Sequence, residues 1–209
     1  FDETSGTVAY DSSGNGNDGN LTNGPTWTNG KIGGALDFDG NNDFLRITNN
    51  NNTLSLANSI TLSVWLNLNE ASQGTILYKN KYGNGTDNDD NYVLGLSTNK
   101  SCNFKIESSI NDQDHVVNSS QTLPLGNWTH IAAHYDLNVL QIFLDGLVVS
   151  TLEVGLVTPY SGSGFLQIGS NSLSNHGTIS FFEGLIDDVR IYDRALSAEE
   201  VQTLYNLGQ

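Results

Sequence analysis

Apolar side chains recur along this chain in short runs, and each run is bounded by Gly, Asn, Asp or Ser. In the stretch SVWLNL, the side chains of Val64, Leu66 and Leu68 alternate with the three others. A period of two is typical of a strand that buries one face. Strands are therefore predicted in GALDFDG, DFLRITN, ITLSVWLNLN, GTILYKNK, YVLGLSTN, CNFKIESS, WTHIAAHYD, LQIFLDGLVVS, GFLQIGS and LIDDVRIYD.

One stretch alone, Ser197–Tyr205, has the pattern of a helix. Ser197 is a suitable N-cap, Glu200 occupies the capping-box position, and Val201 and Leu204 begin an apolar stripe. Many short strands with one short C-terminal helix predict an all-β fold, a two-sheet antiparallel β-sandwich. Neither a linker nor an internal repeat is visible, so residues 1–209 are interpreted as one domain.

Charge narrows the classes of partner. The chain has 8 basic and 23 acidic side chains in 209 residues, a formal net charge of -15. Nucleic acid and anionic lipid both require a surplus of Lys and Arg, so neither is expected as a partner. An acidic surplus suits a secreted or cell-surface protein and carboxylate ligands for Ca²⁺. No apolar run approaches the length of a membrane span, and no membrane insertion is expected. Methionine is absent even at position 1, which indicates a piece of a longer protein.

The order of several motifs resembles a known family. GGALDFDGNNDFLRI, SITLSVWLNL, ILYKNK, LGNWTHIAAHYD, LQIFLDGLVV and GLIDDVRIYDRALSAEEVQTLY follow one another as in bacterial laminin-G-like jelly rolls of the concanavalin A-like lectin/glucanase superfamily. The resemblance covers essentially the whole chain, and WTHIAAHYD and IDDVRIYDRALS are its most specific parts. It implies a jelly-roll fold with adjacent first and last strands, and a tendency to bind calcium and glycans. It does not imply one ligand.

The loop DSSGNGNDG, which begins at Asp11, is a candidate cation site. Asp11, Ser13 and Asn15 fall at positions 1, 3 and 5 of an EF-hand-like spacing, followed by Gly16 and Asn17. Position 12 is a threonine and no helices flank the loop, which excludes an EF-hand. Because Ca²⁺ takes six to eight oxygen ligands, another segment would have to contribute.

The adjacent acids Asp187 and Asp188 interrupt an apolar strand, and alternation buries at least one of them. A buried carboxylate requires a cation or hydrogen bonds. With the strand order that the resemblance implies, one hypothesis is a structural Ca²⁺ held by this pair and the Asp11 loop. The alternative is an Asx-turn loop, with Arg190 or Arg194 paired to the two acids. The calcium hypothesis names Asp11, Asn15, Asn17, Asp187 and Asp188.

Two polar loops are candidate ligand sites. Sugars are bound by amide and carboxylate hydrogen bonds to hydroxyl groups and by an aromatic ring against the apolar sugar face. The loop 80–92 carries all these groups, and the resemblance places the loop 170–184 at the same rim of the sandwich. The candidate ligand-binding residues are Tyr82, Asp87, Asn88, Asp89, Asp90, Asn91, Tyr92, Asn171, Asn175 and His176.

Catalysis is not predicted. Retaining glycoside hydrolysis requires two carboxylates roughly 5 Å apart. In glucanases of the superfamily that this chain resembles, they lie on a strand of the type Glu-x-Asp-x-x-Glu. That strand is absent here, and Glu107 is alone in KIESS. The favoured hypothesis is a non-catalytic, calcium-containing, lectin-like carbohydrate-binding module of a larger secreted or cell-surface protein. The alternatives are a protein-interaction, adhesion or spacer domain, and a glycoside hydrolase or lyase on the same fold.

Overall fold

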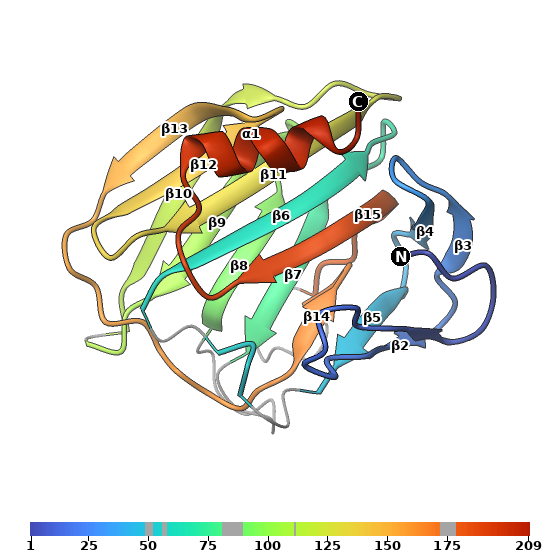
Figure 1. Ribbon diagram of the computed structural model, residues 1–209, viewed down its shortest axis with the longest axis horizontal. Helices are drawn as coiled ribbons and strands as arrows, with labels where there is room; N and C mark the ends of the chain where they lie inside the picture. The colour runs from blue at the N-terminus through green and yellow to red at the C-terminus, as the bar shows by residue number, and fades with distance from the viewer. Residues whose placement is uncertain (49–51, 56–57, 81–89, 111, 172–178) are drawn as a thin grey trace.

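The chain folds into two antiparallel β-sheets packed face to face (Figure 1). This computed structural model describes residues 1–48, 52–55, 58–80, 90–110, 112–171 and 179–209. The predicted sandwich with one short C-terminal helix is confirmed.

The first sheet has eight strands and supplies the surface on which the candidate site lies. Its strand order is β1 (Val8–Ala9), β2 (Gly19–Thr22), β5 (Phe44–Ile47), β14 (Leu166–Ile168), β7 (Gly74–Asn80), β8 (Asp90–Leu96), β9 (Ser101–Glu107) and β10 (Asp114–Thr122).

The second sheet has seven strands, and β15 lies between β6 and β4. The expectation that the first and last strands adjoin is wrong, because β1 pairs with β2 at the edge of the other sheet. The order is β13 (Leu147–Glu153), β12 (Val139–Leu144), β11 (Trp128–Tyr135), β6 (Ile60–Asn67), β15 (Glu183–Tyr192), β4 (Gly34–Asp39) and β3 (Thr26–Asn29).

The core lies between the sheets and follows from alternation along the strands. On β6, Leu62, Val64 and Leu66 are fully buried in the main apolar cluster. Leu94 of β8 and Phe104 of β9 belong to the same cluster from the opposite sheet. The apolar faces predicted from a period of two are therefore the faces that meet.

The helix α1 (Ala198–Asn206) covers the outer face of the seven-stranded sheet (Figure 1). Ser197 and Glu200 form the predicted capping box. Val201 and Leu204 pack in a second, smaller apolar cluster with Ala132 and Phe143 of the sheet. The helix has nine residues, and no helix in the described part of the chain is long and apolar enough to cross a membrane.

Beneath α1 lies a buried aromatic group. The ring of Trp65 stacks on Tyr205 of the helix, with centroids 5.7 Å apart, and lies beside His130. His130 is fully buried, and its Nε2 lies 2.9 Å from Ser63 Oγ. Burial, with a smaller contribution from the charge of Arg190, lowers the pKa of His130 from 6.5 to about 4.

This histidine predicts a loss of stability in acid. Between pH 6.5 and about 4 the unfolded chain binds a proton at His130 that the folded chain does not. The free energy of unfolding should therefore fall as the pH decreases through this window, by about 3 kcal/mol from this residue. Urea unfolding of the wild type and His130→Gln at several pH values measures the slope of the unfolding free energy against pH.

The variant should show a shallower slope than the wild type. Part of the slope should remain, because burial also lowers the pKa of His134. His115→Gln is the matched control, since this side chain on β10 is only partly buried. Equal slopes for the wild type and His130→Gln would contradict the prediction.

Candidate functional site

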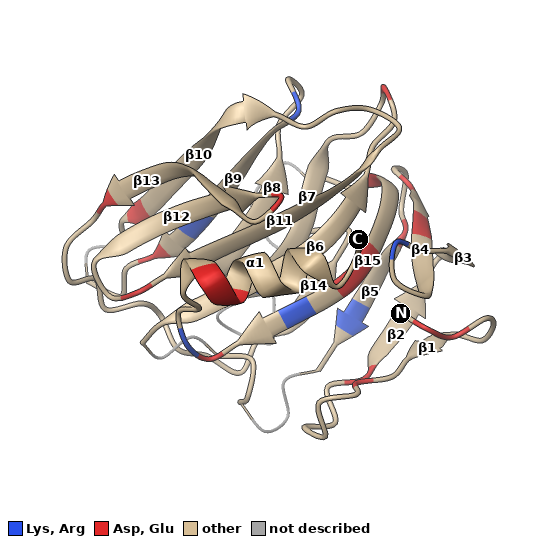
Figure 2. Ribbon diagram, turned by 45° about the horizontal axis from the view of Figure 1, so that its top comes forward, with Lys and Arg blue, Asp and Glu red and all other residues tan. Residues whose placement is uncertain are grey.

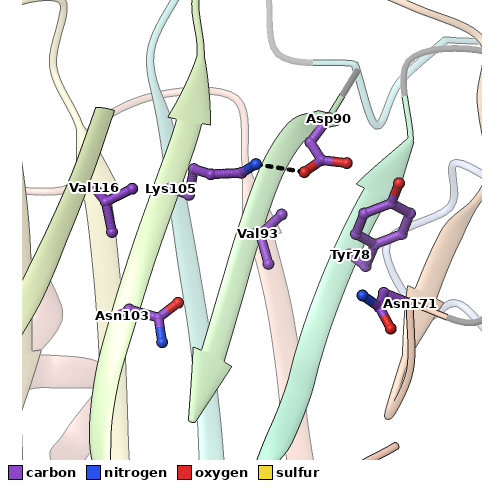
Figure 3. Close-up of a pocket in the computed structure, with 7 residues that line it drawn as sticks. All are labelled: Tyr78, Asp90, Val93, Asn103, Lys105, Val116 and Asn171. Atoms are coloured by element: carbon purple, nitrogen blue, oxygen red, sulfur yellow. Dashed lines mark ion pairs between the residues drawn. The ribbon is translucent and has the colours of Figure 1, made fainter. Parts of the chain in front are cut away.

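A pocket of about 250 Å³ opens on the outer face of the eight-stranded sheet, the face turned away from the core (Figure 3). Four neighbouring strands, β7 to β10, form most of it. The remaining part comes from the segment that follows β14. The residues that line the pocket are Tyr78, Asp90, Val93, Asn103, Lys105, Val116 and Asn171.

Register explains why side chains from different strands share this pocket. Tyr78 pairs with Val93, Val93 with Lys105, and Lys105 with Val116, so these four residues form one row across the sheet. Residues that are paired directly in antiparallel strands point to the same face. Their neighbours along each strand point inward, which leaves the row on the outer surface.

A buried ion pair closes one end of the pocket. Lys105 Nζ lies 2.6 Å from Asp90 Oδ2 and 3.1 Å from Asp114 Oδ1. Burial opposes the charge on Lys105, but the two carboxylates outweigh it and raise the pKa of the ammonium. Glu107 Oε2 accepts a hydrogen bond of 2.6 Å from the Asp90 backbone N–H, and burial raises the pKa of Glu107.

Sequence reasoning missed this cluster because its members belong to three strands. From the sequence, Glu107 is a lone acid in KIESS, and no role is assigned to Lys105. Their spacing of two, shared with Asn103, was the available signal that all three point to one face.

Gly95 makes room for the amide of Asn103. The two residues are paired across β8 and β9. A Cβ at Gly95 would lie 2.9 Å from Asn103 Oδ1 and 3.2 Å from its Nδ2. The missing side chain therefore leaves the space that the Asn103 amide occupies beside β8.

Two of the predicted ligand-binding residues line the pocket. Asp90 lies at the ion-pair end, and Asn171 lies beside Tyr78 (Figure 3). Asn171 belongs to a hairpin stem, where its Oδ1 accepts a hydrogen bond of 2.6 Å from the Ser180 backbone N–H. The loops 80–92 and 170–184 thus contribute to one rim. The predicted residues Tyr82, Asp87, Asn88, Asp89, Asn175 and His176 lie outside the described residues.

Asn91 and Tyr92 do not line the pocket, which corrects the prediction for both. Tyr92 is fully buried in the core, and its hydroxyl donates a hydrogen bond of 3.0 Å to the Leu54 carbonyl. Burial raises the pKa of Tyr92. Asn91 is fully buried, and its amide donates to the Tyr160 carbonyl. Both side chains hold strand β8 to neighbouring segments.

A buried lysine fixes the segment beside β7. Lys79 Nζ donates hydrogen bonds of 3.0, 3.0 and 2.8 Å to the carbonyls of Asn80, Gly162 and Gly164. The side chain is fully buried, and burial lowers its pKa to about 7. Three carbonyl acceptors match the three N–H donors of an ammonium group. Lys79 therefore ties the chain around residues 162–164 to the end of β7.

The loop that begins at Asp11 is closed by its own hydrogen bonds. The Asp11 carboxylate accepts from the backbone N–H groups of Ser13 and Asn17, at 2.9 Å each, and from the Ser13 hydroxyl. Asn15 donates to the Ser13 hydroxyl. Asn17 Oδ1 accepts from Thr53 Oγ1. These contacts are those of an Asx turn.

The two acids of β15 lie in separate networks. Asp187 is fully buried, and its carboxylate accepts backbone hydrogen bonds from Lys31, Ile32 and Asp188. Asp188 forms an ion pair of 2.9 Å with Arg190. Nowhere in the described residues do three or more His, Cys, Asp or Glu side chains come together to hold a metal ion. The three acids named for calcium, Asp11, Asp187 and Asp188, are therefore not grouped in this way.

Several solved structures share this fold. The binding domain of Paraclostridial Mosquitocidal Protein 1 matches with a TM-score of 0.73 and 16% identity over 94% of this chain and 49% of that one. The botulinum neurotoxin serotype G binding domain matches with a TM-score of 0.72 and 16% identity, over 95% of this chain and 48% of that one. This chain thus spans about half the length of either toxin structure.

A third structure matches over nearly the full length of both chains. It is domain 4 of AbnA, an extracellular GH43 arabinanase from Geobacillus stearothermophilus, in complex with arabinotriose. The TM-score is 0.69 and the identity 21%, over 95% of this chain and 91% of that one. At these identities the likeness shows a shared fold. The laminin-G-like family model, described as "Concanavalin A-like lectin/glucanases superfamily", matches residues 38–202, and the chain belongs to that family.

Proposed function

We propose that this chain is a non-catalytic carbohydrate-binding module of a larger secreted or cell-surface protein, and that it binds glycan in the pocket on the eight-stranded sheet. Protein interaction or adhesion without sugar binding is the alternative.

The composition of the pocket supports this proposal most directly. Asp90, Asn103 and Lys105 present hydrogen-bonding groups beside the apolar side chains of Val93 and Val116. A few placed polar groups on an apolar lining are typical of small-ligand sites. Sugar hydroxyls can both donate to a carboxylate and accept from an amide or ammonium group. A purely apolar surface would instead favour a protein partner.

The structural relatives support the same interpretation. One is a domain of an extracellular arabinanase in complex with arabinotriose, and others are binding domains of toxins. Each of these structures is one domain of a larger protein. By analogy of fold, arabinan fragments belong among the first ligands to test.

The geometry gives catalysis little support. Asp90 is the one carboxylic acid among the described residues that line the pocket, and its carboxylate faces Lys105. Glu107 is nearly buried and holds the Asp90 backbone N–H. A glycosidase needs one carboxylic acid and one carboxylate on either side of the scissile bond. The described pocket residues do not offer that pair.

Removal of the Asn103 amide tests the proposed site. Asn103→Ala should weaken glycan binding about tenfold, because losing one hydrogen bond to a ligand costs roughly 1 to 1.5 kcal/mol. Isothermal titration with arabinotriose and a panel of neutral oligosaccharides measures the change. The melting temperature should stay close to that of the wild type, since Asn103 lies on the outer face.

Asn20→Ala is the matched control. Asn20 is an exposed residue of β2, in the same sheet but remote from β9 in the strand order. Its replacement should leave binding unchanged. Equal affinities for Asn103→Ala and the wild type would place the site elsewhere. Absence of binding to every glycan would favour the adhesion alternative.

Calcium is a separate prediction from the sequence, and the Asp11 loop and Asp187 are its two parts. Thermal unfolding in EDTA and then in excess Ca²⁺ tests it. A rise in melting temperature that Asp11→Ala abolishes would support the hypothesis. Asp187→Ala should lower stability by about 3 kcal/mol under both conditions, because three backbone N–H groups lose their acceptor.

A further inference from the structure

We infer that the pocket on the eight-stranded sheet selects uncharged glycans and excludes those that carry carboxylate or sulfate groups. The inference rests on the proposed function and adds the class of ligand. Its basis is the Asp90–Lys105–Asp114 cluster, which places one cation between two acids at the end of the pocket. Figure 3 shows the Lys105–Asp90 pair of this cluster.

Lys105 is the cation through which an acidic sugar would have to bind. Its side chain is 16% exposed, whereas that of Asp90 is 4% exposed and that of Asp114 52% exposed. Both acids already contact the ammonium group. A ligand carboxylate that approached Lys105 would be repelled by both acids, and displacing Asp90 would leave a nearly buried charge without its partner.

The other described cations are also engaged within the molecule. Eight Lys and Arg residues occur in the sequence, and Lys81 lies outside the described residues. Arg46 lies on the same sheet face. Its guanidinium lies 3.6 Å from the ring centroid of Phe165, and its Nε is buried without a hydrogen-bond partner, out of reach of a ligand. The remaining contacts are Lys31 over Trp65, Lys79 to three carbonyls, Lys100 to the carbonyls of Glu70 and Ser72, Arg190 to Asp188, and Arg194 to Glu200.

Electrostatic repulsion also disfavours the binding of acidic glycans. Three acidic residues, Asp90, Glu107 and Asp114, surround the single ammonium of Lys105, and Asp and Glu residues are spread over both sheets (Figure 2). The net charge of -15 adds a long-range barrier to anions. A neutral hydroxyl meets no such barrier and can donate a hydrogen bond to the same carboxylates.

Matched pairs of glycans test the selection. Three suitable pairs share a backbone and differ in charge: hydroxyethyl-cellulose and carboxymethyl-cellulose, methyl-esterified and de-esterified homogalacturonan, and lactose and sialyllactose. Affinity electrophoresis or titration should show binding to the neutral member of at least one pair and at least about tenfold weaker binding to its acidic partner.

Asp114→Asn tests the role of the cluster itself. The variant removes one of the two charges that neutralise Lys105, and Asp114 is exposed enough for the fold to tolerate the change. Binding of the acidic member should rise by roughly two- to fivefold relative to the neutral member. Glu70→Gln is the control, because it makes the same change of charge at an exposed turn after β6. The ratio of its affinities for the neutral and the acidic member should equal that of the wild type.

The outcomes separate the inference from the proposed function. Preferential binding of the acidic members, or equal ratios for Asp114→Asn and Glu70→Gln, would overturn the inference and leave a glycan-binding module. Absence of binding to either member of every pair would overturn the proposed function as well. Higher salt should narrow the ratio in the wild type, because screening weakens repulsion, while binding of the neutral member should not change.

Discussion

Neighbouring side chains of a β-strand point to opposite faces, and both the core and the pocket depend on this constraint. On β8 and β9, Tyr92 and Phe104 point inward and complete the core, while Val93 and Lys105 point outward into the pocket. One set of strands therefore forms both the core and the pocket. A slip of one residue in the register of β9 would bury Lys105 and expose Phe104.

The sequence predicts features that depend on local spacing. The strands and the α1 capping box need only a few adjacent residues, and both predictions are confirmed. Tyr92 was assigned to the rim because it is the aromatic residue at the end of the polar loop 80–92. The stretch YVLGL that begins there has apolar side chains on both faces, so its pattern does not show which face is inside. The loop that begins at Asp11 has the oxygen spacing of a cation site, but the same spacing suits the turn that its backbone N–H groups form.

Features that depend on pairing between distant strands are not predictable from spacing. The contact of Lys105 with Asp90 and Asp114 requires the order β8, β9, β10 and one particular register. Local patterns do not contain that information. The separation of β1 from β15 has the same cause, because strand order in a sandwich is decided by how all the strands pack. Lys79 is a further case, since two of the three carbonyls that it binds lie more than eighty residues away.

Both ends of the described chain meet the turn at residues 30–34. The Phe1 carbonyl lies against Gly34, and Gly208 packs between Trp65 and Lys31. The ends therefore leave the molecule near each other, beside the seven-stranded sheet, while the pocket opens on the other sheet. Closely spaced ends are the arrangement that allows a domain to be inserted into a loop of another protein. Polypeptide joined at either end would emerge from one region, beside the seven-stranded sheet, and would leave the face that carries the pocket uncovered.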